Sequence, residues 1–310
     1  MDLLVVGGSG YLGSELVRQA IRAGRTVAAT AYSRAVGDHV GDHVGDHVGD
    51  HVGDHVGDHV GERSVGGDVD WHRLDMRRAD DVRDLLRDLR PHKVVNAAYD
   101  YRDWATTAIA PAHLAGAAAE VGARLVHVSS DAVFSGDASP YDETRAPDPV
   151  SPYGAAKAAA EVAVSALLPT AVIARTSLIV GDGDSAQERL IHTIAAGGDG
   201  ALFTDEVRCP IHVSDLARAL LELADSAYSG TAHVAGADAV NRYDLGLLVA
   251  ARDGLDPARL STGLRAESSR RGGIDVRLDC RATQGRLVTR LRGVRSLWAP
   301  RSEAADDGGE

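Results

Sequence analysis

The chain has few cysteines, few aromatic residues and little basic charge. Only 2 of its 310 residues are cysteines, Cys209 and Cys280, so no disulfide framework is expected and a reducing compartment suits the chain. Aromatic residues make up 4% of the sequence, and the formal net charge is -12. Because nucleic-acid phosphates bind basic surfaces, this charge argues against a nucleic-acid partner.

Long hydrophobic runs are also missing. No apolar segment approaches the roughly 20 residues that a membrane-spanning helix needs. The first residues lack the basic flank and cleavage pattern of a leader peptide. With 44% hydrophobic and 25% charged residues, the composition is typical of a globular chain with a sizeable core. We therefore expect a soluble, cytoplasmic protein that does not associate with membranes.

One low-complexity segment differs from this ordinary composition. Residues 37–60 are six copies of Gly-Asp-His-Val, which hold 6 of the 13 histidines and contribute -6 to the net charge. A helix there would carry glycine at every fourth position, at about 1 kcal/mol each relative to alanine. Two interpretations remain: a weak zinc, nickel or copper site, or a duplicated surface loop, whose added length has a small entropic cost. We favour the loop and expect no metal.

Short apolar runs alternate with helical patterns along the chain. The runs expected to form strands are residues 2–6, 26–32, 69–76, 92–98, 123–130 and 170–176. The helical patterns are residues 12–23, 79–89, 111–121, 153–167, 216–224 and 243–254. Strands that alternate with helices predict an α/β fold in which helices cover both faces of a doubly wound parallel sheet.

A glycine-rich turn joins the first expected strand to the first helix. Residues 7–13, Gly-Gly-Ser-Gly-Tyr-Leu-Gly, satisfy both G-x-G-x-x-G and G-x-x-G-x-x-G in the strand–turn–helix context that gives such patterns meaning. Glycine lets the backbone approach a pyrophosphate, and the helix N-terminus presents N–H groups to the anion. The residues expected to bind a dinucleotide here are Gly7, Gly10, Tyr11, Leu12 and Gly13.

The residues after the second expected strand indicate which dinucleotide binds. An NAD site places Asp or Glu about 20 residues after the glycines, whereas this chain has Ser33 and Arg34 and no acidic residue before Asp38. A hydroxyl and a guanidinium suit a 2′-phosphate. We therefore expect NADP(H) to be preferred over NAD(H), with Ser33 and Arg34 in the cofactor site. An ordinary loop arginine is the alternative for Arg34.

A serine and a Tyr-x-x-x-Lys pair supply the candidate chemistry. Ser130 ends an expected strand, and Tyr153 and Lys157 lie four residues apart on one face of an expected helix. An ammonium beside a phenol favours the phenolate, so we expect Lys157 to lower the pKa of Tyr153. Tyr153 can pass a proton to a carbonyl oxygen while hydride reaches the carbon, and the Ser130 hydroxyl can position that oxygen.

These residues resemble the extended short-chain dehydrogenase/reductases, and within them the dTDP-4-dehydrorhamnose reductase group. The resemblance covers nearly the whole chain apart from residues 36–61 and the tail. It rests on residues 7–13, 94–103, 125–136, 140–161, 174–181 and 208–223. It implies that Ser130 is the catalytic hydroxyl, that Tyr153 is the proton donor and that Lys157 binds the nicotinamide ribose.

The same resemblance implies further contacts. Cofactor contacts are implied for Asp75, Met76, Asn96, Ala97 and Ala98, in addition to Tyr153 and Lys157. Substrate contacts are implied for Asp131 and Arg208. For Arg175, a place near the active site and a buried structural role both remain open. Thr107 stands where the group has an asparagine, so the resemblance does not carry over a water relay that depends on that asparagine.

The implied activity is NADPH-dependent reduction of a 4-keto group on a nucleotide-activated deoxysugar. The implied fold is a Rossmann-like sheet with a smaller C-terminal substrate lobe. We place the NADP-binding domain at residues 1–176, a substrate lobe with segments that return to the sheet at 177–298, and a disordered tail at 299–310. The expected partner is a nucleotide sugar, and a homodimer is the assembly considered.

A rival interpretation assigns no catalysis to the fold. The N-terminal half also resembles the beta subunit of methionine adenosyltransferase, an NADP-binding regulatory protein. Sugar-nucleotide 4,6-dehydratases carry a glutamate where this chain has Ala132, which argues against dehydration. The complete set of Ser130, Tyr153 and Lys157 favours the reductase over the regulatory subunit.

Overall fold

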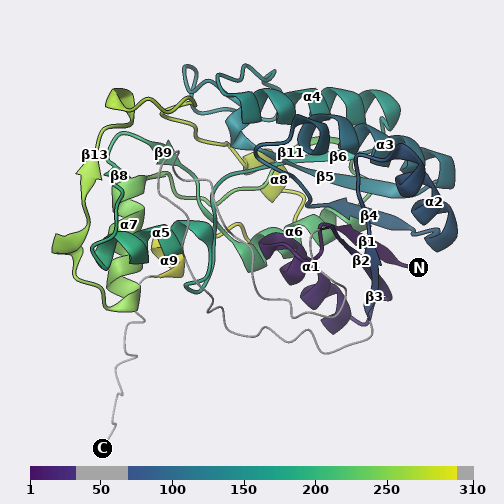
Figure 1. The fold of residues 1–310 in the computed structure, drawn as a ribbon, viewed down its shortest axis with the longest axis horizontal. Coiled ribbons are helices and arrows are strands. Elements are labelled where there is room, and N and C mark those ends of the chain that lie inside the picture. The colour runs from purple at the N-terminus through teal and green to yellow at the C-terminus, as the bar shows by residue number, and fades with distance from the viewer. Residues whose placement is uncertain (33–68, 299–310) are drawn as a thin grey trace, which may run out of the picture.

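The computed structural model describes residues 1–32 and 69–298, and its centre is a seven-stranded sheet (Figure 1). In sheet order the strands are β11 (Gly230–His233), β6 (Val172–Thr176), β5 (Arg124–Ser130), β4 (Lys93–Asn96), β1 (Leu3–Val6), β2 (Val27–Ala31) and β3 (Val69–Arg73). Every neighbouring pair in this sheet is parallel. The predicted Rossmann-like, doubly wound parallel sheet is therefore confirmed. Four predictions, for Ser33, Arg34, the repeat at 37–60 and the tail at 299–310, lie outside the described residues.

Helices cover both faces of the sheet. Successive side chains of a strand point to opposite faces, so each buried strand contributes apolar side chains to two separate cores. Leu3 and Val5 belong to one buried cluster, whereas Leu4 and Val6 belong to another. The helices of the first cluster are α1 (Tyr11–Arg22) and α6 (Val213–Asp225). The helices of the second are α2 (Ala79–Leu89), α3 (Ala110–Val121) and α4 (Pro152–Leu167). Strands that are apolar on both faces require this arrangement.

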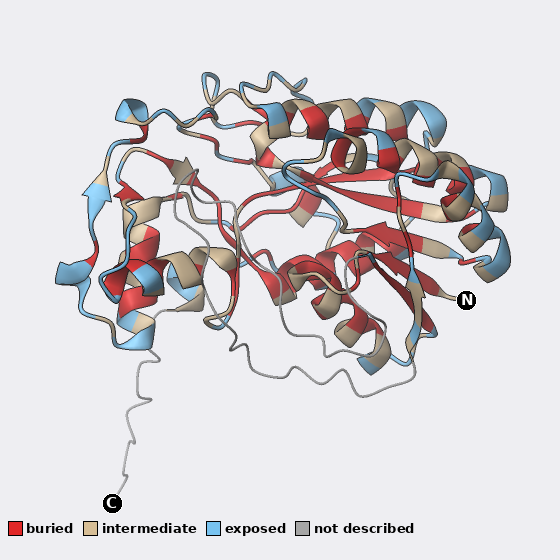
Figure 2. Cartoon of the chain, viewed as in Figure 1, coloured by how far each residue is buried: buried red, intermediate tan, exposed pale blue. Residues whose placement is uncertain are grey.

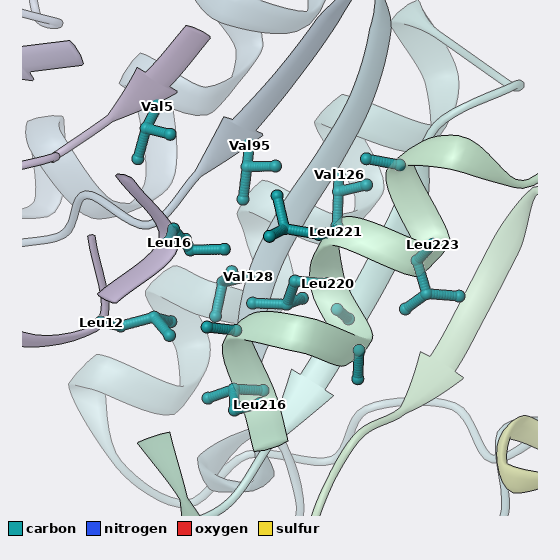
Figure 3. Packing of buried hydrophobic residues seen from close by; sticks show 14 of the residues in the cluster. Val5, Leu12, Leu16, Val95, Val126, Val128, Leu216, Leu220, Leu221 and Leu223 are labelled. Carbon is teal, nitrogen blue, oxygen red and sulfur yellow. The ribbon is translucent and has the colours of Figure 1, made fainter. Parts of the chain in front are cut away.

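The first cluster shows how residues distant in sequence complete the core. In Figure 3, Leu12 and Leu16 of α1 and Leu216 and Leu220 of α6 surround Val128 and its neighbours on the sheet. Burial of each such leucine contributes about 1.5–3 kcal/mol relative to exposure. Figure 2 shows the matching pattern, with buried strands and exposure concentrated on loops and outer helix faces.

A smaller C-terminal region has a core of its own. Helices α5 (Ala186–Ala195) and α7 (Arg242–Asp253) pack around Ile191 and Val249. Its strands pair in twos: β7 (Ile179–Val180) with β10 (Ile211–His212), β9 (Val207–Arg208) with β12 (Val240–Asn241), and β8 (Leu202–Phe203) with β13 (Thr262–Gly263). The remaining short elements are η1 (Ala105–Ile109), η2 (Asp131–Val133), η3 (Pro257–Arg259), η4 (Arg265–Glu267), α8 (Arg281–Gln284) and α9 (Val294–Leu297).

The predicted elements are present with ends that differ by a few residues. The helix predicted at 79–89 has these bounds in the structure, and the helix predicted at 216–224 extends to Val213–Asp225. The periodicity did not predict β11 or the short paired strands, because two to four residues carry no readable period. The ten-residue helix α5 was also not predicted. Throughout residues 1–32 and 69–298, no helix combines the length and apolar character needed to cross a membrane.

The sheet topology determines where a ligand binds. From the middle of the sheet, β1, β2 and β3 follow one another toward one edge, and β4, β5 and β6 follow one another toward the other edge. The order of the strands therefore reverses between β1 and β4. Ligands of doubly wound sheets bind at this switch point, beyond the carboxyl ends of the strands. The glycine turn follows β1, and Ser130 ends β5, so the candidate residues collect at this edge.

Candidate functional site

The glycine turn of residues 7–13 is closely packed at three of its four glycines, and at Gly8 an added Cβ would lie 2.7 Å from the Cβ of Ala29. Gly7 has φ of +81°, and a Cβ there would lie 2.8 Å from the backbone of Ala98. A Cβ on Gly13 would lie 2.0 Å from the carbonyl oxygen of Gly7. At Gly10, by contrast, the nearest atom would be that same carbonyl oxygen at 3.4 Å. Gly7 and Gly13 are thus required by packing, and Gly10 faces the open side of the turn.

The start of α1 suits an anion. Gly10 is its N-cap and provides no side-chain cap, and the first turn has no acidic residue. The positive end of the helix dipole is therefore not neutralised by a cap or a first-turn carboxylate. An open glycine beside such a helix end fits the pyrophosphate of a dinucleotide.

The two residues between the last glycines have different surroundings. Leu12 is buried in the core under the sheet, where it anchors the helix. The Tyr11 hydroxyl donates a hydrogen bond to Oδ1 of Asp184 at 3.0 Å, which links α1 to the segment after β7. Of the predicted pair, Tyr11 alone reaches toward the smaller C-terminal region.

Asp75 and Met76 follow β3 at the end of the sheet predicted to hold the adenosine. Met76 is buried, and the Asp75 carboxylate accepts hydrogen bonds from Nε and Nη2 of Arg77, both at 2.8 Å. The Arg77 guanidinium lowers the pKa of Asp75. It also lies 5.1 Å from the ring centroid of Tyr32, the residue after β2. Sequence reasoning missed Arg77 and Tyr32, although both lie just beyond the ends of neighbouring strands.

Asn96 organises the loop after β4. Its amide donates to Nδ1 of His127 at 3.1 Å, and its Oδ1 accepts from the Ala98 N–H at 3.1 Å. The Ala97 N–H donates to the carbonyl oxygen of Val6 at 2.9 Å. Asn96 therefore holds Ala98, and the carbonyl oxygen of Val6 holds Ala97, beside the glycine turn.

Ser130 and Asp131 lie where β5 ends. The Ser130 hydroxyl accepts from the Ala132 N–H at 3.2 Å and caps the short helix η2. Asp131 is buried, and its Oδ2 accepts from the Ser177 hydroxyl at 2.6 Å. Burial raises the pKa of Asp131, and the guanidinium of Arg208 acts in the opposite direction. The Ser130 hydroxyl thus lies at the end of β5, and the Asp131 carboxylate links this end to Ser177, which follows β6.

Tyr153 and Lys157 lie on α4, which begins at Pro152 after a Ser151 cap. The ring of Tyr153 stacks on that of Tyr101, with centroids 4.5 Å apart and planes inclined by 18°. Lys157 is only 3% exposed, and its Nζ donates to the carbonyl oxygen of Val128 at 3.0 Å. That Nζ lies 5.9 Å from the Tyr153 ring centroid. The structure thus brings the predicted pair together beside β5.

The pKa expected for Tyr153 is wrong in sign. Removal of the phenol from water raises the pKa of Tyr153 well above 10, and the nearby Tyr99 raises it further. A hydrogen bond with Ser130 lowers it but is outweighed. Lys157 does not dominate as predicted, because burial lowers its own pKa to about 8 and its ammonium is directed at Val128. Tyr153 is consequently held as the protonated phenol at neutral pH.

Arg208 is engaged by the protein itself. Its guanidinium donates to the carbonyl oxygens of Val207, Gly273 and Ile274 at 2.7, 2.6 and 2.9 Å. Its Nε lies 3.6 Å from Oδ2 of Asp131, and its Nη2 lies 3.2 Å from Oε1 of Glu206. In this arrangement Arg208 supports Asp131, and the predicted contact with substrate would need some of these bonds to open.

Aromatic residues in the loop after β4 were not predicted to belong to the site. Tyr99 and Tyr101 both pack on Tyr153, and Trp104 follows on the same loop. Thr107, in the π-helical turn η1, accepts from the Asp100 N–H at 3.0 Å and donates to the Asp100 carbonyl oxygen. Thr107 thus holds this loop in shape. The sequence did contain a signal for this aromatic group, because three aromatic residues stand within six positions in a chain with only 4% aromatic residues.

Other residues considered from the sequence are engaged by the protein itself. Cys209 is buried, and burial raises the pKa of its thiol to about 11, which suits a structural role. Arg175 is buried and paired with Glu161, a residue that sequence reasoning missed despite its four-residue spacing from Lys157. Within the described ranges, 1–32 and 69–298, no group of three His, Cys, Asp or Glu side chains could hold a metal ion.

Lys157→Met is expected to raise stability at pH 7. The ordinary pKa of 10.5 applies to the unfolded chain and about 8 to the folded one, so below pH 8 the folded state carries a buried charge. This penalty disappears as the pH rises from 8 to 10.5, because there only the unfolded chain still binds the proton. We expect a gain of about 1–3 kcal/mol at pH 7, reduced by the hydrogen bond that Val128 loses.

Thermal unfolding of wild type and Lys157→Met at pH 7 and pH 10 measures this effect. The difference in Tm should shrink at the higher pH. A destabilised variant at both pH values would mean that Lys157 is held for packing and not for chemistry.

Comparisons with known proteins agree with this geometry. A family model described as the RmlD substrate binding domain matches residues 1–273. The dTDP-4-dehydrorhamnose reductase of Mycobacterium tuberculosis (strain CDC 1551 / Oshkosh) is 38% identical over 165 residues, 51% of this chain and 54% of that protein. The match thus spans about half the length of this relative. Methionine adenosyltransferase 2 subunit beta of Pongo abelii is 28% identical over 246 residues, 70% of this chain and 73% of that protein.

Solved structures show the same fold. The dTDP-4-dehydrorhamnose reductase of Bacillus anthracis str. Ames in complex with NADP has a TM-score of 0.74 at 18% identity, over 96% of each chain. The Bordetella bronchiseptica enzyme WbmH in complex with NAD+ has a TM-score of 0.75 at 18% identity, over 96% of each chain. Because the family model matches most of the sequence, the chain belongs to the RmlD substrate-binding-domain family, the dTDP-4-dehydrorhamnose reductase-like group of the extended short-chain dehydrogenase/reductases.

Proposed function

We propose that the protein is an NADPH-dependent reductase of a 4-keto group on a nucleotide-activated deoxysugar, with Tyr153 as the proton donor. The observation that carries this proposal is the grouping of three side chains: Tyr153 and Lys157 lie on adjacent turns of α4, and Tyr153 is hydrogen-bonded to Ser130 at the end of β5. A reductase needs the acid form of its tyrosine to protonate the developing alkoxide. Reduction of a sugar nucleotide is the chemistry named for relatives such as the dTDP-4-dehydrorhamnose reductase of Mycobacterium tuberculosis.

Each candidate catalytic side chain has a separate task in this proposal. Bound nicotinamide supplies a hydride to the carbonyl carbon. Tyr153 gives its phenolic proton to the carbonyl oxygen, so that ketone, hydride and proton together make the alcohol. The Ser130 hydroxyl donates a hydrogen bond to the same oxygen and orients it. Lys157, charged below about pH 8, binds the ribose hydroxyls.

The cofactor site in this proposal runs along the carboxyl edge of the sheet. Gly7, Gly10 and Gly13 would hold the pyrophosphate, because the uncapped start of α1 suits an anion. Asp75 and Met76 would border the adenine, and Asn96 would hold the loop between the two halves of the dinucleotide. The preference for NADP(H) rests on the residue types of Ser33 and Arg34.

The division of labour between the two parts of the chain is also proposed. Residues 1–176 bind the cofactor, and residues 177–298 bind the sugar nucleotide, with β11 and α6 returning to the sheet. Asp131 and its partner Arg208 lie where these parts meet, so they would orient the substrate from the β5 end.

A second candidate is a non-catalytic NADP-binding regulatory subunit. The similarity to methionine adenosyltransferase 2 subunit beta supports it, because that similarity covers 73% of the relative, more than the 54% covered in the reductase. The catalytic set of Ser130, Tyr153 and Lys157 favours the reductase instead.

Loss of NADPH absorbance in the presence of dTDP-4-keto-6-deoxysugars tests the proposal. NADH is measured in parallel, and the matching sugar with a hydroxyl at C4 is the control. Oxidation of NADPH with the ketone alone supports the reductase. NADPH binding without oxidation by any of these ketones, together with co-elution with a methionine adenosyltransferase catalytic subunit, would replace it with the regulatory function.

A further inference from the structure

A buried ion pair lies directly under the candidate catalytic residues. Glu161 of α4 and Arg175 of β6 are both less than 10% exposed. The guanidinium contacts the carboxylate through Nη2 at 2.7 Å and through Nε at 3.0 and 3.2 Å. The Ser129 hydroxyl donates to Oε1 of Glu161 at 2.5 Å. Three elements, α4, β5 and β6, are thereby joined by one carboxylate.

Arg175 is itself held in place on its other side. Its Nη1 donates to the carbonyl oxygen of Arg145 at 3.1 Å, and its guanidinium lies 5.0 Å from the ring centroid of Phe134. A guanidinium held by a carboxylate, a carbonyl and an aromatic ring has little freedom to move. The position of the Glu161 carboxylate is therefore well defined.

Glu161 continues a series along α4. Tyr153, Lys157 and Glu161 are four residues apart, so they lie on adjacent turns of one helix face. Lys157 binds the carbonyl oxygen of Val128, and Glu161 binds the hydroxyl of Ser129. These two residues of β5 lead directly to Ser130. The helix is thus attached to the strand in the register that puts Tyr153 beside Ser130.

We propose that Glu161 is a positioning residue for the reductase: it fixes α4 on β5 and places a carboxylate one helical turn from Lys157. This inference rests on the proposed function of Lys157 and Tyr153. Glu161 touches neither substrate nor cofactor in this scheme. It acts through Lys157 by charge and through Ser129 by position.

The charges around Lys157 agree with this role. Burial lowers the pKa of Lys157 to about 8, and Glu161 raises it again. Among residues 1–32 and 69–298, Lys157 also faces the phenols of Tyr153 and Tyr99 and the imidazole of His127 on β5, whose pKa burial and then Lys157 lower well below 6.5. The Arg175 guanidinium, paired with Glu161, offsets part of the negative charge of that carboxylate. Loss of the carboxylate would therefore leave the ammonium with less support.

Glu161→Gln tests the inference, because glutamine can still accept from Ser129 but carries no charge. NADPH affinity is measured by fluorescence titration between pH 6 and pH 10, and the reduction rate is measured over the same range. We expect the alkaline loss of affinity and rate to move about one pH unit lower than in wild type. If NADPH affinity and rate are lost at the same alkaline pH as in wild type while Tm is lowered, the proposal is overturned and Glu161 is merely structural.

Glu188→Gln is the matched control. Glu188 is also a buried glutamate paired with an arginine, Arg252, but it lies in the smaller C-terminal region. The Glu188→Gln variant should have a lower Tm, but it should lose NADPH affinity at the same alkaline pH as wild type. If Glu188→Gln shifted the pH of this loss as far as Glu161→Gln does, the shift would reflect a general destabilisation of the fold, and the proposal would fail.

Two further measurements keep the test decisive. If Glu161→Gln does not fold, the double variant Glu161→Met/Arg175→Met replaces the ion pair with apolar side chains, which buried pairs often tolerate. A smaller shift in the same direction is expected from it, because the positive charge of Arg175 is removed together with the carboxylate, and an unmoved alkaline limit overturns the proposal. NADPH affinity needs no substrate, so it decides the role of Glu161 even if no tested sugar is reduced.

Discussion

Tyr153→Phe is expected to lower the rate of NADPH-dependent ketone reduction by about 10²–10⁴-fold, because the phenylalanine ring cannot donate a proton. The ring itself is kept, so its stack on Tyr101 and the packing of α4 should survive. NADPH affinity and Tm should therefore stay close to wild type. Initial rates at saturating NADPH, together with a fluorescence titration of the cofactor, measure both sides of this expectation.

The neighbouring phenol provides the control for this substitution. Tyr101→Phe removes a hydroxyl from the ring that stacks on Tyr153 and leaves the stack in place. It should change the rate far less than Tyr153→Phe does. Full turnover by Tyr153→Phe would show that the proton comes from another group, and the proposed mechanism would be wrong.

Gly13→Ala is expected to destabilise the fold by about 3 kcal/mol and to abolish NADPH binding. The added Cβ would lie 2.0 Å from the carbonyl oxygen of Gly7 and 2.8 Å from the Cα of Gly8, both backbone atoms that cannot rotate away. Either α1 or the turn must therefore shift. Thermal unfolding and a fluorescence titration with NADPH detect the two consequences.

Gly10→Ala separates packing from cofactor binding within the same turn. Its Cβ would meet only the Gly7 carbonyl oxygen, at 3.4 Å, so Tm should remain near that of wild type. NADPH affinity should still fall, because the methyl group stands on the side from which a pyrophosphate approaches. Equal loss of Tm in the two variants would contradict this division of roles between the glycines.

The fold and the proximity of Tyr153 and Lys157 were predictable from local patterns. Apolar runs such as 123–130 and the helical period at 79–89 predicted β5 and α2, since burial on both faces of a sheet leaves a readable signal. The glycine turn and the four-residue spacing of Tyr153 and Lys157 likewise place their residues on one turn and one helix face. Strand β11 escaped prediction, because its four residues pair with β6 only in the folded sheet.

The electrostatics of the site could not be predicted in this way. Spacing along α4 indicated that Lys157 lies near Tyr153, but it did not indicate how deeply either side chain is buried. Burial sets the pKa of both groups, and it raises that of Tyr153 where a charge argument alone predicted the reverse. Arg208 shows the same limit, because Gly273 and Ile274, which bind it, are more than 60 residues away in the chain.

The sequence by itself determined the layered α/β architecture, the glycine turn and the identities of Ser130, Tyr153 and Lys157, because each depends on residues close together in the chain. Only the tertiary structure decided the protonation of Tyr153, the engagement of Arg208 and the link from Ser129 through Glu161 to Arg175. Those properties depend on how far water is excluded and on which distant groups meet, and packing alone establishes both.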